Sequence, residues 1–327
     1  MSNVTAENCP AVPAGWHCAT SQQFERASAA VGLCAIAAWL ISARAVGGGD
    51  EGDVMSRAVS RATASATGAP LHSLVARETA IGGYGGMTDT LNSTVSIVKP
   101  GQIDMTVKDF AWKGRPFEAP IYYGVRVQRW HSLTGFGSMV DFTHAKAIAL
   151  ATSDATFTGT RDGKPVPPKS KVEGTFRHLE FSHGHNMLTW NGLFRWPALV
   201  GRIRPYVGGG AGISLPHTEI GFRDKNARTY EYQFAGFVGQ VLGGVEIDLG
   251  RASVFFEYKF SYAPYDVPLS EEPRGHLLFT DLWRQFRAWM GGVEPSGGRL
   301  TTTLATHHGI GGILVRVGAA APAASQR

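Results

Sequence analysis

The stretch from Leu179 to Glu219 constrains the fold most, because its apolar and polar residues alternate with a period of two. In its first half the large apolar residues occupy one face and the polar residues the other: Leu188, Trp190, Phe194 and Trp196 against His183, His185, Thr189, Asn191 and Arg195. The second half alternates in the same way after a tight turn at 198–201. A period of two predicts β-strands, and an apolar face opposite a charged face is typical of a transmembrane β-barrel.

The composition of the chain agrees with this interpretation. The 327 residues include 41 glycines and 10% aromatic residues, but only 17% are charged. The net charge of +5 is modest and no basic run is present, so the sequence does not predict nucleic-acid binding. All three cysteines precede residue 46, which leaves the rest of the chain free of thiols and fits export to an oxidising compartment.

Changes in amino-acid composition along the chain divide it into four regions. Residues 1–45 read as a long n-region and a secretory signal peptide, with an apolar run at 27–43 and cleavage after Ala45. Residues 46–77 are small and polar and predict a periplasmic linker, with a short helix around 54–64. Residues 78–318 form the predicted barrel, and residues 319–327 form a tail.

The barrel region contains eight strand candidates, at residues 79–87, 121–130, 135–146, 180–196, 202–215, 230–249, 252–262 and 303–317. Long and short connections alternate between them, which is the pattern of bacterial outer-membrane barrels with short periplasmic turns and long extracellular loops. The sequence therefore predicts an all-β fold, an antiparallel transmembrane β-barrel of eight strands in the outer membrane. Charged residues on the inward faces would fill its lumen as an ion-pair network.

Strand direction places several histidines at the outer rim. Six histidines and one glutamate fall there: His144, His183, His185, His217, His307, His308 and Glu219. This combination is typical of a first-row metal site or an acid/base site, while the structural alternative is hydrogen bonding at the headgroup level. Strict alternation places His183 and His185 together on the inward face. It directs His144, His217 and Glu219 outward unless a bulge changes their direction.

Residues 279–290 carry the one clear helical pattern of the barrel region, with an apolar stripe formed by Phe279, Leu282, Trp283, Phe286 and Met290. In the last external loop such a helix would either pack on the rim or lie flat at the membrane surface, where it could cover a lipid site. The sequence contains no Walker loop, GxGxxG turn, GxSxG elbow or CxxC pair in a credible setting.

Five segments resemble the outer-membrane lipid A oxidase family of rhizobia: DFTHAKA at 141–147, SHGHNMLTWNGLFRW at 182–196, RPYVGGGAGISLPHTE at 204–219, FEYKFSY at 256–262 and THH at 306–308. The resemblance spans residues 79–318. It implies a barrel whose active relatives oxidise the proximal glucosamine of lipid A to 2-aminogluconate with molecular oxygen. The sequence departs from the barrel pattern in lacking a terminal aromatic residue on its last strand.

The resulting hypothesis is an oxidase with oxygen as co-substrate and a divalent, iron-type metal. Its expected catalytic residues are His183, His185, His144 and Glu219. Its expected metal ligands are His183, His185, His217, His307 and His308, and its expected substrate-binding residues are Asn186, Lys146, Arg284 and Arg287. The expected partners are the membrane and lipid A or lipopolysaccharide in the outer leaflet, with the protein as a monomer. The alternatives are a non-enzymatic structural or adhesive barrel, and a lipid A deacylase with Ser182 or Ser214 as nucleophile.

Overall fold

The computed structural model describes residues 78–131, 135–272 and 277–317. The expected signal peptide, the linker with its helix around 54–64 and the C-terminal tail lie outside these residues. Among the residues described, neither helix has the length and apolar character that crossing a membrane requires.

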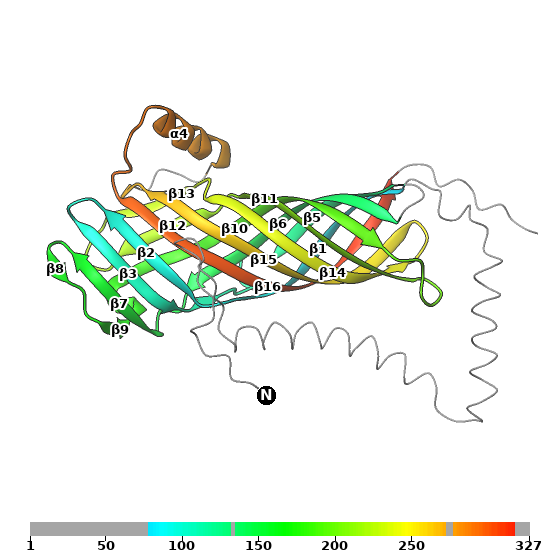
Figure 1. The fold of residues 1–327 in the computed structure, drawn as a ribbon, viewed down its shortest axis with the longest axis horizontal. Coiled ribbons are helices and arrows are strands. Elements are labelled where there is room, and N and C mark those ends of the chain that lie inside the picture. The colour runs from blue at the N-terminus through cyan, green and yellow to red at the C-terminus, as the bar shows by residue number, and fades with distance from the viewer. Residues whose placement is uncertain (1–77, 132–134, 273–276, 318–327) are drawn as a thin grey trace, which may run out of the picture. The chain divides into compact units, whose positions relative to one another are not determined.

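Eight antiparallel strands form a closed barrel (Figure 1). They neighbour one another in the order in which they occur along the chain, and the first closes the barrel by pairing with the last. In this order the strands are β1 (Glu78–Thr90), β5 (Tyr123–Trp130), β6 (Phe136–Ala149), β10 (Phe176–Arg195), β11 (Ile203–Ser214), β14 (Gly236–Asp248), β15 (Ala252–Leu269) and β16 (Gly298–Val317). This confirms the predicted antiparallel barrel of eight strands.

The outer surface of the barrel carries an apolar band to which every strand contributes. Its exposed side chains include Ile81, Val125, Val140, Trp190, Val207, Val241, Phe256 and Ile313. An apolar exterior around a polar interior is the pattern of a transmembrane barrel of the outer-membrane type. On the side of the long connections the band ends at Tyr123 in β5, Leu188 in β10 and Ile213 in β11, so the strand residues beyond these positions lie outside the membrane-spanning part.

Buried ion pairs fill the lumen of the membrane-spanning part. Arg126 donates two hydrogen bonds to Glu257, of 2.8 and 2.9 Å, and one of 3.2 Å to Asp141. Lys259 binds the other oxygen of Asp141 at 2.8 Å. All four side chains are fully buried. Because each charged group has a partner of opposite sign, the ion pairs offset the free-energy cost of burying these charges. The network confirms the predicted polar filling of the lumen.

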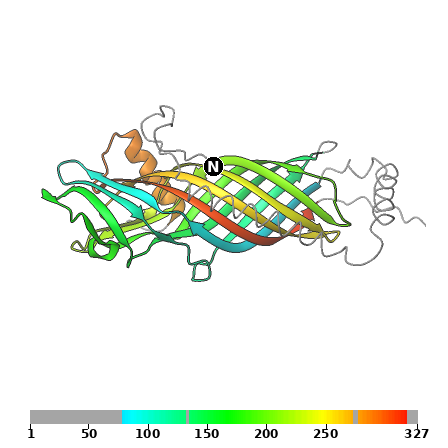
Figure 2. The ribbon, with the colours of Figure 1, turned by 60° about the horizontal axis from the view of Figure 1, so that its bottom comes forward.

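Beyond the band, the long connections form further strands rather than irregular loops (Figures 1 and 2). Strands β2 (Ser93–Lys99), β3 (Ile103–Phe110) and β7 (Asp154–Arg161) continue the sheet from β16, and β12 (His217–Phe222) and β13 (Arg228–Tyr232) extend it from β10. Short elements lie beside them: β4 (Trp112–Lys113), β8 (Lys164–Pro165), β9 (Lys169–Lys171) and α3 (Val172–Thr175). The interior of this extension is an apolar core that includes Ile97, Met105, Phe157, Phe181 and Leu300.

The predicted helix is present as α4 (Leu278–Met290), and it lies beside β13 (Figure 1). The backbone N–H of Tyr232 donates to Asp281 at 3.1 Å, and that of Phe234 donates to the Gln285 side chain at 2.7 Å. Most of the apolar stripe does not pack on the barrel: Leu282 is half-buried, but the other four members are exposed, namely Phe279, Trp283, Phe286 and Met290. The ring of Phe234 contacts that of Phe237, a residue of the apolar band, so the helix lies next to the band.

Candidate functional site

A bulge in β10 determines where its two histidines lie. Phe181 pairs with Ala147 of β6 but His185 pairs with Ala145, so β10 has two extra residues at this point. Gly184 lies inside the bulge with a φ of +133°, a conformation that favours glycine. His183 is exposed while His185 is fully buried. The structure therefore separates the two histidines that the alternation placed on one inward face.

Three of the predicted histidines lie on the outer face of the wall, just beyond the apolar band. His144 stacks on the ring of Tyr123, with centroids 4.8 Å apart, and the rings of His183 and His217 are also 4.8 Å apart. Nδ1 of His144 donates to Oδ1 of Asn186 at 2.8 Å. Its Nε2 therefore carries the lone pair, and this atom has no hydrogen-bond partner among the described residues. We call His144, His183 and His217 the outer histidines.

Hydroxyl groups flank the exposed member of this set. Oγ of Ser182 lies 3.3 Å from Nδ1 of His183, and the hydroxyl of Tyr230 lies 3.5 Å from its Nε2. Tyr230 also meets the ring of His217 edge-on, with centroids 4.5 Å apart. Neutral imidazoles in such a setting can accept a proton from a hydroxyl group of a bound molecule.

Two carboxylates lie further from the membrane on the same outer face. Glu180 of β10 is directly opposite Glu219 of β12. Nδ1 of His178 lies 3.4 Å from Glu180 and 3.9 Å from Glu219, and Arg228 binds Glu219 at 2.7 Å. Burial, followed by the charge of Glu219, raises the pKa of the Glu180 carboxyl. One potential ligand atom from each of His178, Glu180 and Glu219 lies within 4.8 Å of the others, which is close enough for all three to bind one metal ion.

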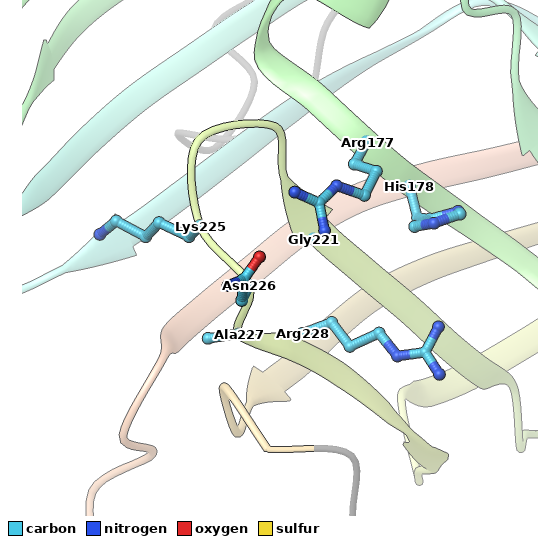
Figure 3. Close-up of a pocket in the computed structure, with 7 residues that line it drawn as sticks. All are labelled: Arg177, His178, Gly221, Lys225, Asn226, Ala227 and Arg228. Atoms are coloured by element: carbon cyan, nitrogen blue, oxygen red, sulfur yellow. The ribbon is translucent and has the colours of Figure 1, made fainter.

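A small pocket lies further out, between β10 and the turn that joins β12 to β13 (Figure 3). It has a volume of about 160 Å³ and is lined by Arg177, His178, Gly221, Lys225, Asn226, Ala227 and Arg228. We call it the arginine pocket. It shares His178 and Arg228 with the carboxylate group, so the two features form one continuous surface.

Two other predicted residues face the interior instead. His185 Nδ1 contacts the Tyr265 hydroxyl, and both residues are buried. His308 binds Tyr122 at 3.2 Å through Nδ1 and Ser261 at 2.9 Å through Nε2. Buried partners on the lumen side give these histidines no access to a molecule outside the barrel, so they do not join the outer histidines in one centre.

His307 lies apart from both groups. It faces outward on β16, where the Tyr258 hydroxyl contacts its Nδ1 at 2.6 Å. Because β16 and β10 are separated by three strands in either direction around the barrel, His307 is on the opposite wall from the outer histidines.

The predicted substrate-binding residues are also spread over several elements. Asn186 lies at the outer histidines, whereas the Lys146 ammonium donates to the Glu118 backbone oxygen at 2.8 Å. Arg284 of α4 binds Asp281 at 3.1 Å, and Arg287 is exposed on the same helix.

Neither Glu180 nor His178 is among the site residues predicted from the sequence. Both residues have even numbers, like the outward-facing residues of β10. The HLE triplet at 178–180 places a histidine and a glutamate two residues apart, so the sequence alone could have put them on one face of the strand. Their proximity to Glu219 depends on the pairing of β10 with β12, which the sequence pattern did not reveal.

Comparison with known proteins adds little about function. No protein-family model and no curated protein matches the chain. Among solved structures, the crystal structure of Neisserial surface protein A (NspA) aligns with a TM-score of 0.32 and 8% sequence identity, over 74% of this chain and 97% of that chain.

Proposed function

We propose that this barrel is an outer-membrane enzyme that oxidises the proximal glucosamine of lipid A to 2-aminogluconate with molecular oxygen. The observation that supports it is the position of the outer histidines. Their rings are on the outer side of the wall, immediately beyond the apolar band, where His183 is exposed while His144 and His217 are buried. A sugar headgroup of an outer-leaflet lipid held beside the band would meet His183. A lumen-facing site would be separated from such a substrate by the closed wall of the barrel.

The reaction balances as a two-electron oxidation. The C1 hemiacetal of the sugar loses two electrons and two protons to give a lactone, and oxygen accepts them to give hydrogen peroxide. Water then opens the lactone, which adds the extra oxygen atom of the acid. The chain must accept the proton of the C1 hydroxyl, and the imidazole of His183, the exposed member of the outer histidines, is the base proposed for this step.

A divalent metal would supply binding and activation of oxygen, which protein side chains do not provide. The described residues offer the set of His178, Glu180 and Glu219 for it, one histidine and two carboxylates, in place of the five histidines expected from the sequence. Arg228 already binds one oxygen of Glu219, so a metal would use the other oxygen or displace the guanidinium.

A second function has one observation in its favour. Ser182 and His183 form a hydroxyl and imidazole pair at 3.3 Å, the first contact that a lipid A deacylase would need. Ser214, the other expected nucleophile, is fully buried. The third candidate is a non-enzymatic structural or adhesive barrel. In that case the external sheet of β2, β3 and β7 would contact molecules outside the cell.

The test uses purified full-length protein with lipid A that has a free C1 hydroxyl, under air and under nitrogen. We expect the lipid to gain one oxygen atom under air only, with release of one peroxide per turnover. Loss of an acyl chain under both gases would identify a deacylase, and unchanged lipid under air would favour the non-enzymatic barrel.

A further inference from the structure

The arginine pocket carries a cation with no carboxylate partner. Arg177 donates one hydrogen bond of 3.1 Å to the Arg223 backbone oxygen, and no carboxylate of the described residues lies within ion-pair distance of it. Figure 3 shows its side chain beside Gly221, within the pocket. An arginine without a counterion next to a concave surface is available to an external anion.

The other cations of the pocket have defined roles. Arg228 gives one N–H to Glu219 at 2.7 Å and keeps further donors, because a guanidinium has five. Lys225 is directed away from the pocket in Figure 3 and lies 3.5 Å from Asp162. The nearby Asp224 contacts Arg161, whose hydrogen bond lowers the pKa of that carboxyl. Of the lining side chains, the Arg177 guanidinium points toward Gly221 in the pocket, while that of Arg228 extends away from it, to Glu219 (Figure 3). Arg177 is thus the cation that an anion in the pocket would meet.

The arginine pocket and the proposed reaction site lie along the same strand, β12. Along β12 the outward positions are His217, Glu219 and Gly221, which belong in turn to the outer histidines, the carboxylates and the pocket. Successive outward positions of a strand are about 7 Å apart, so the pocket lies roughly 14 Å beyond His217.

We infer that the arginine pocket binds an anionic substituent, a phosphate or a sugar carboxylate, on the saccharide of an outer-leaflet glycolipid. The inference rests on the proposed function for the identity of the lipid. Oxidation needs a free hydroxyl at C1 of the proximal sugar, so the recognised anion belongs to the distal sugar or to a residue attached to it. By binding the anion on the distal side, the pocket would orient the headgroup so that its proximal sugar lies at the outer histidines.

The experiment measures binding without turnover. Full-length protein in detergent micelles is mixed with equal amounts of 4′-monophosphoryl lipid A and the same lipid lacking its phosphate, and native mass spectrometry counts each complex. The wild-type protein should prefer the phosphorylated lipid by about tenfold, the effect of one charge-assisted hydrogen bond. The R177Q variant should lose this preference.

The matched control is R299Q, which removes the same charge from an exposed arginine of β16 that binds Asp266. It should keep the wild-type preference. Equal binding of the two lipids by the wild-type protein, or an unchanged preference in R177Q, would overturn the inference. Inorganic phosphate should compete with the phosphorylated lipid in the wild-type protein; binding of phosphate without any lipid preference would indicate a site for free anions instead. Retained preference without oxidation would refute only the oxidase proposal.

Discussion

Glu180 of β10 and Glu219 of β12 lie directly opposite each other on the outer face of the barrel wall. Two carboxylates in this arrangement repel, and only Glu219 has an arginine at close range, Arg228 at 2.7 Å. Such a pair is unfavourable for stability alone, since like charges on opposite positions of paired strands destabilise a sheet. Its presence next to His178 and the outer histidines is therefore better explained by a role in binding.

The first prediction concerns the pH dependence of stability. Burial and the charge of Glu219 raise the pKa of Glu180 in the folded protein. The unfolded chain, with a glutamate pKa of about 4.3, releases this proton first, so stability should fall as the pH rises from that value to the folded pKa. E180Q should remove this fall. Urea unfolding in micelles with EDTA measures it, and parallel curves for both proteins would contradict the prediction.

The second prediction separates the outer and inner histidines. H183A should lower oxidation by at least about a hundredfold, the usual effect of a proton-transfer group, and leave unfolding unchanged. H185A should cost about 2 to 4 kcal/mol of stability, because it opens a cavity and leaves the Tyr265 hydroxyl without its partner. H307A should leave oxidation unchanged, since His307 lies on the wall opposite the outer histidines. Loss of oxidation in H307A with normal activity in H183A would refute this arrangement.

The third prediction tests the bulge. G184A places a Cβ 2.3 Å from the Asn186 side chain at a positive φ. We expect a loss of about 1 to 3 kcal/mol, together with lower oxidation, because His183 and Asn186 would both move. The control is G309A on β16, where a Cβ would have no neighbour within 4 Å and should change little. Equal unfolding midpoints for the two variants would show that the bulge tolerates a side chain.

The fourth prediction concerns α4, whose exposed stripe should lie in the outer leaflet. In a protein whose three native cysteines are replaced by serine, a spin label at W283C should be more accessible to oxygen than to a water-soluble nickel reagent in lipid bilayers. A label at K164C, on exposed β8, should show the reverse. The same accessibility at both positions would place the helix in water.

Much of the barrel was predictable from the sequence because its strands obey one physical rule. Residues such as Val125 and Arg126 alternate between lipid and lumen, so the period of two identifies both the strands and their faces. The segment 230–249 was the exception. It was predicted as one strand but forms β13 and β14, because Phe234 continues the apolar alternation across the break between them.

The external sheet and the site were less predictable. Strands β2, β3 and β7 lie in segments where long loops were expected. The pairing of β2 with β16 and of β7 with β3 joins segments that are distant in the sequence. The placement of the histidines depended on one glycine, because Gly184 allows a bulge that changes the direction of His183. A pattern of alternation contains no information about such a shift.

The most direct test of the account is mass spectrometry of lipid A from cells with and without this gene, grown with and without oxygen. We expect one added oxygen atom on the proximal sugar only when both the gene and oxygen are present, and we expect this oxygen atom to be missing in the H183A variant. Unchanged lipid A in a host whose lipid has a free C1 hydroxyl, with the barrel present in the outer membrane, would contradict it.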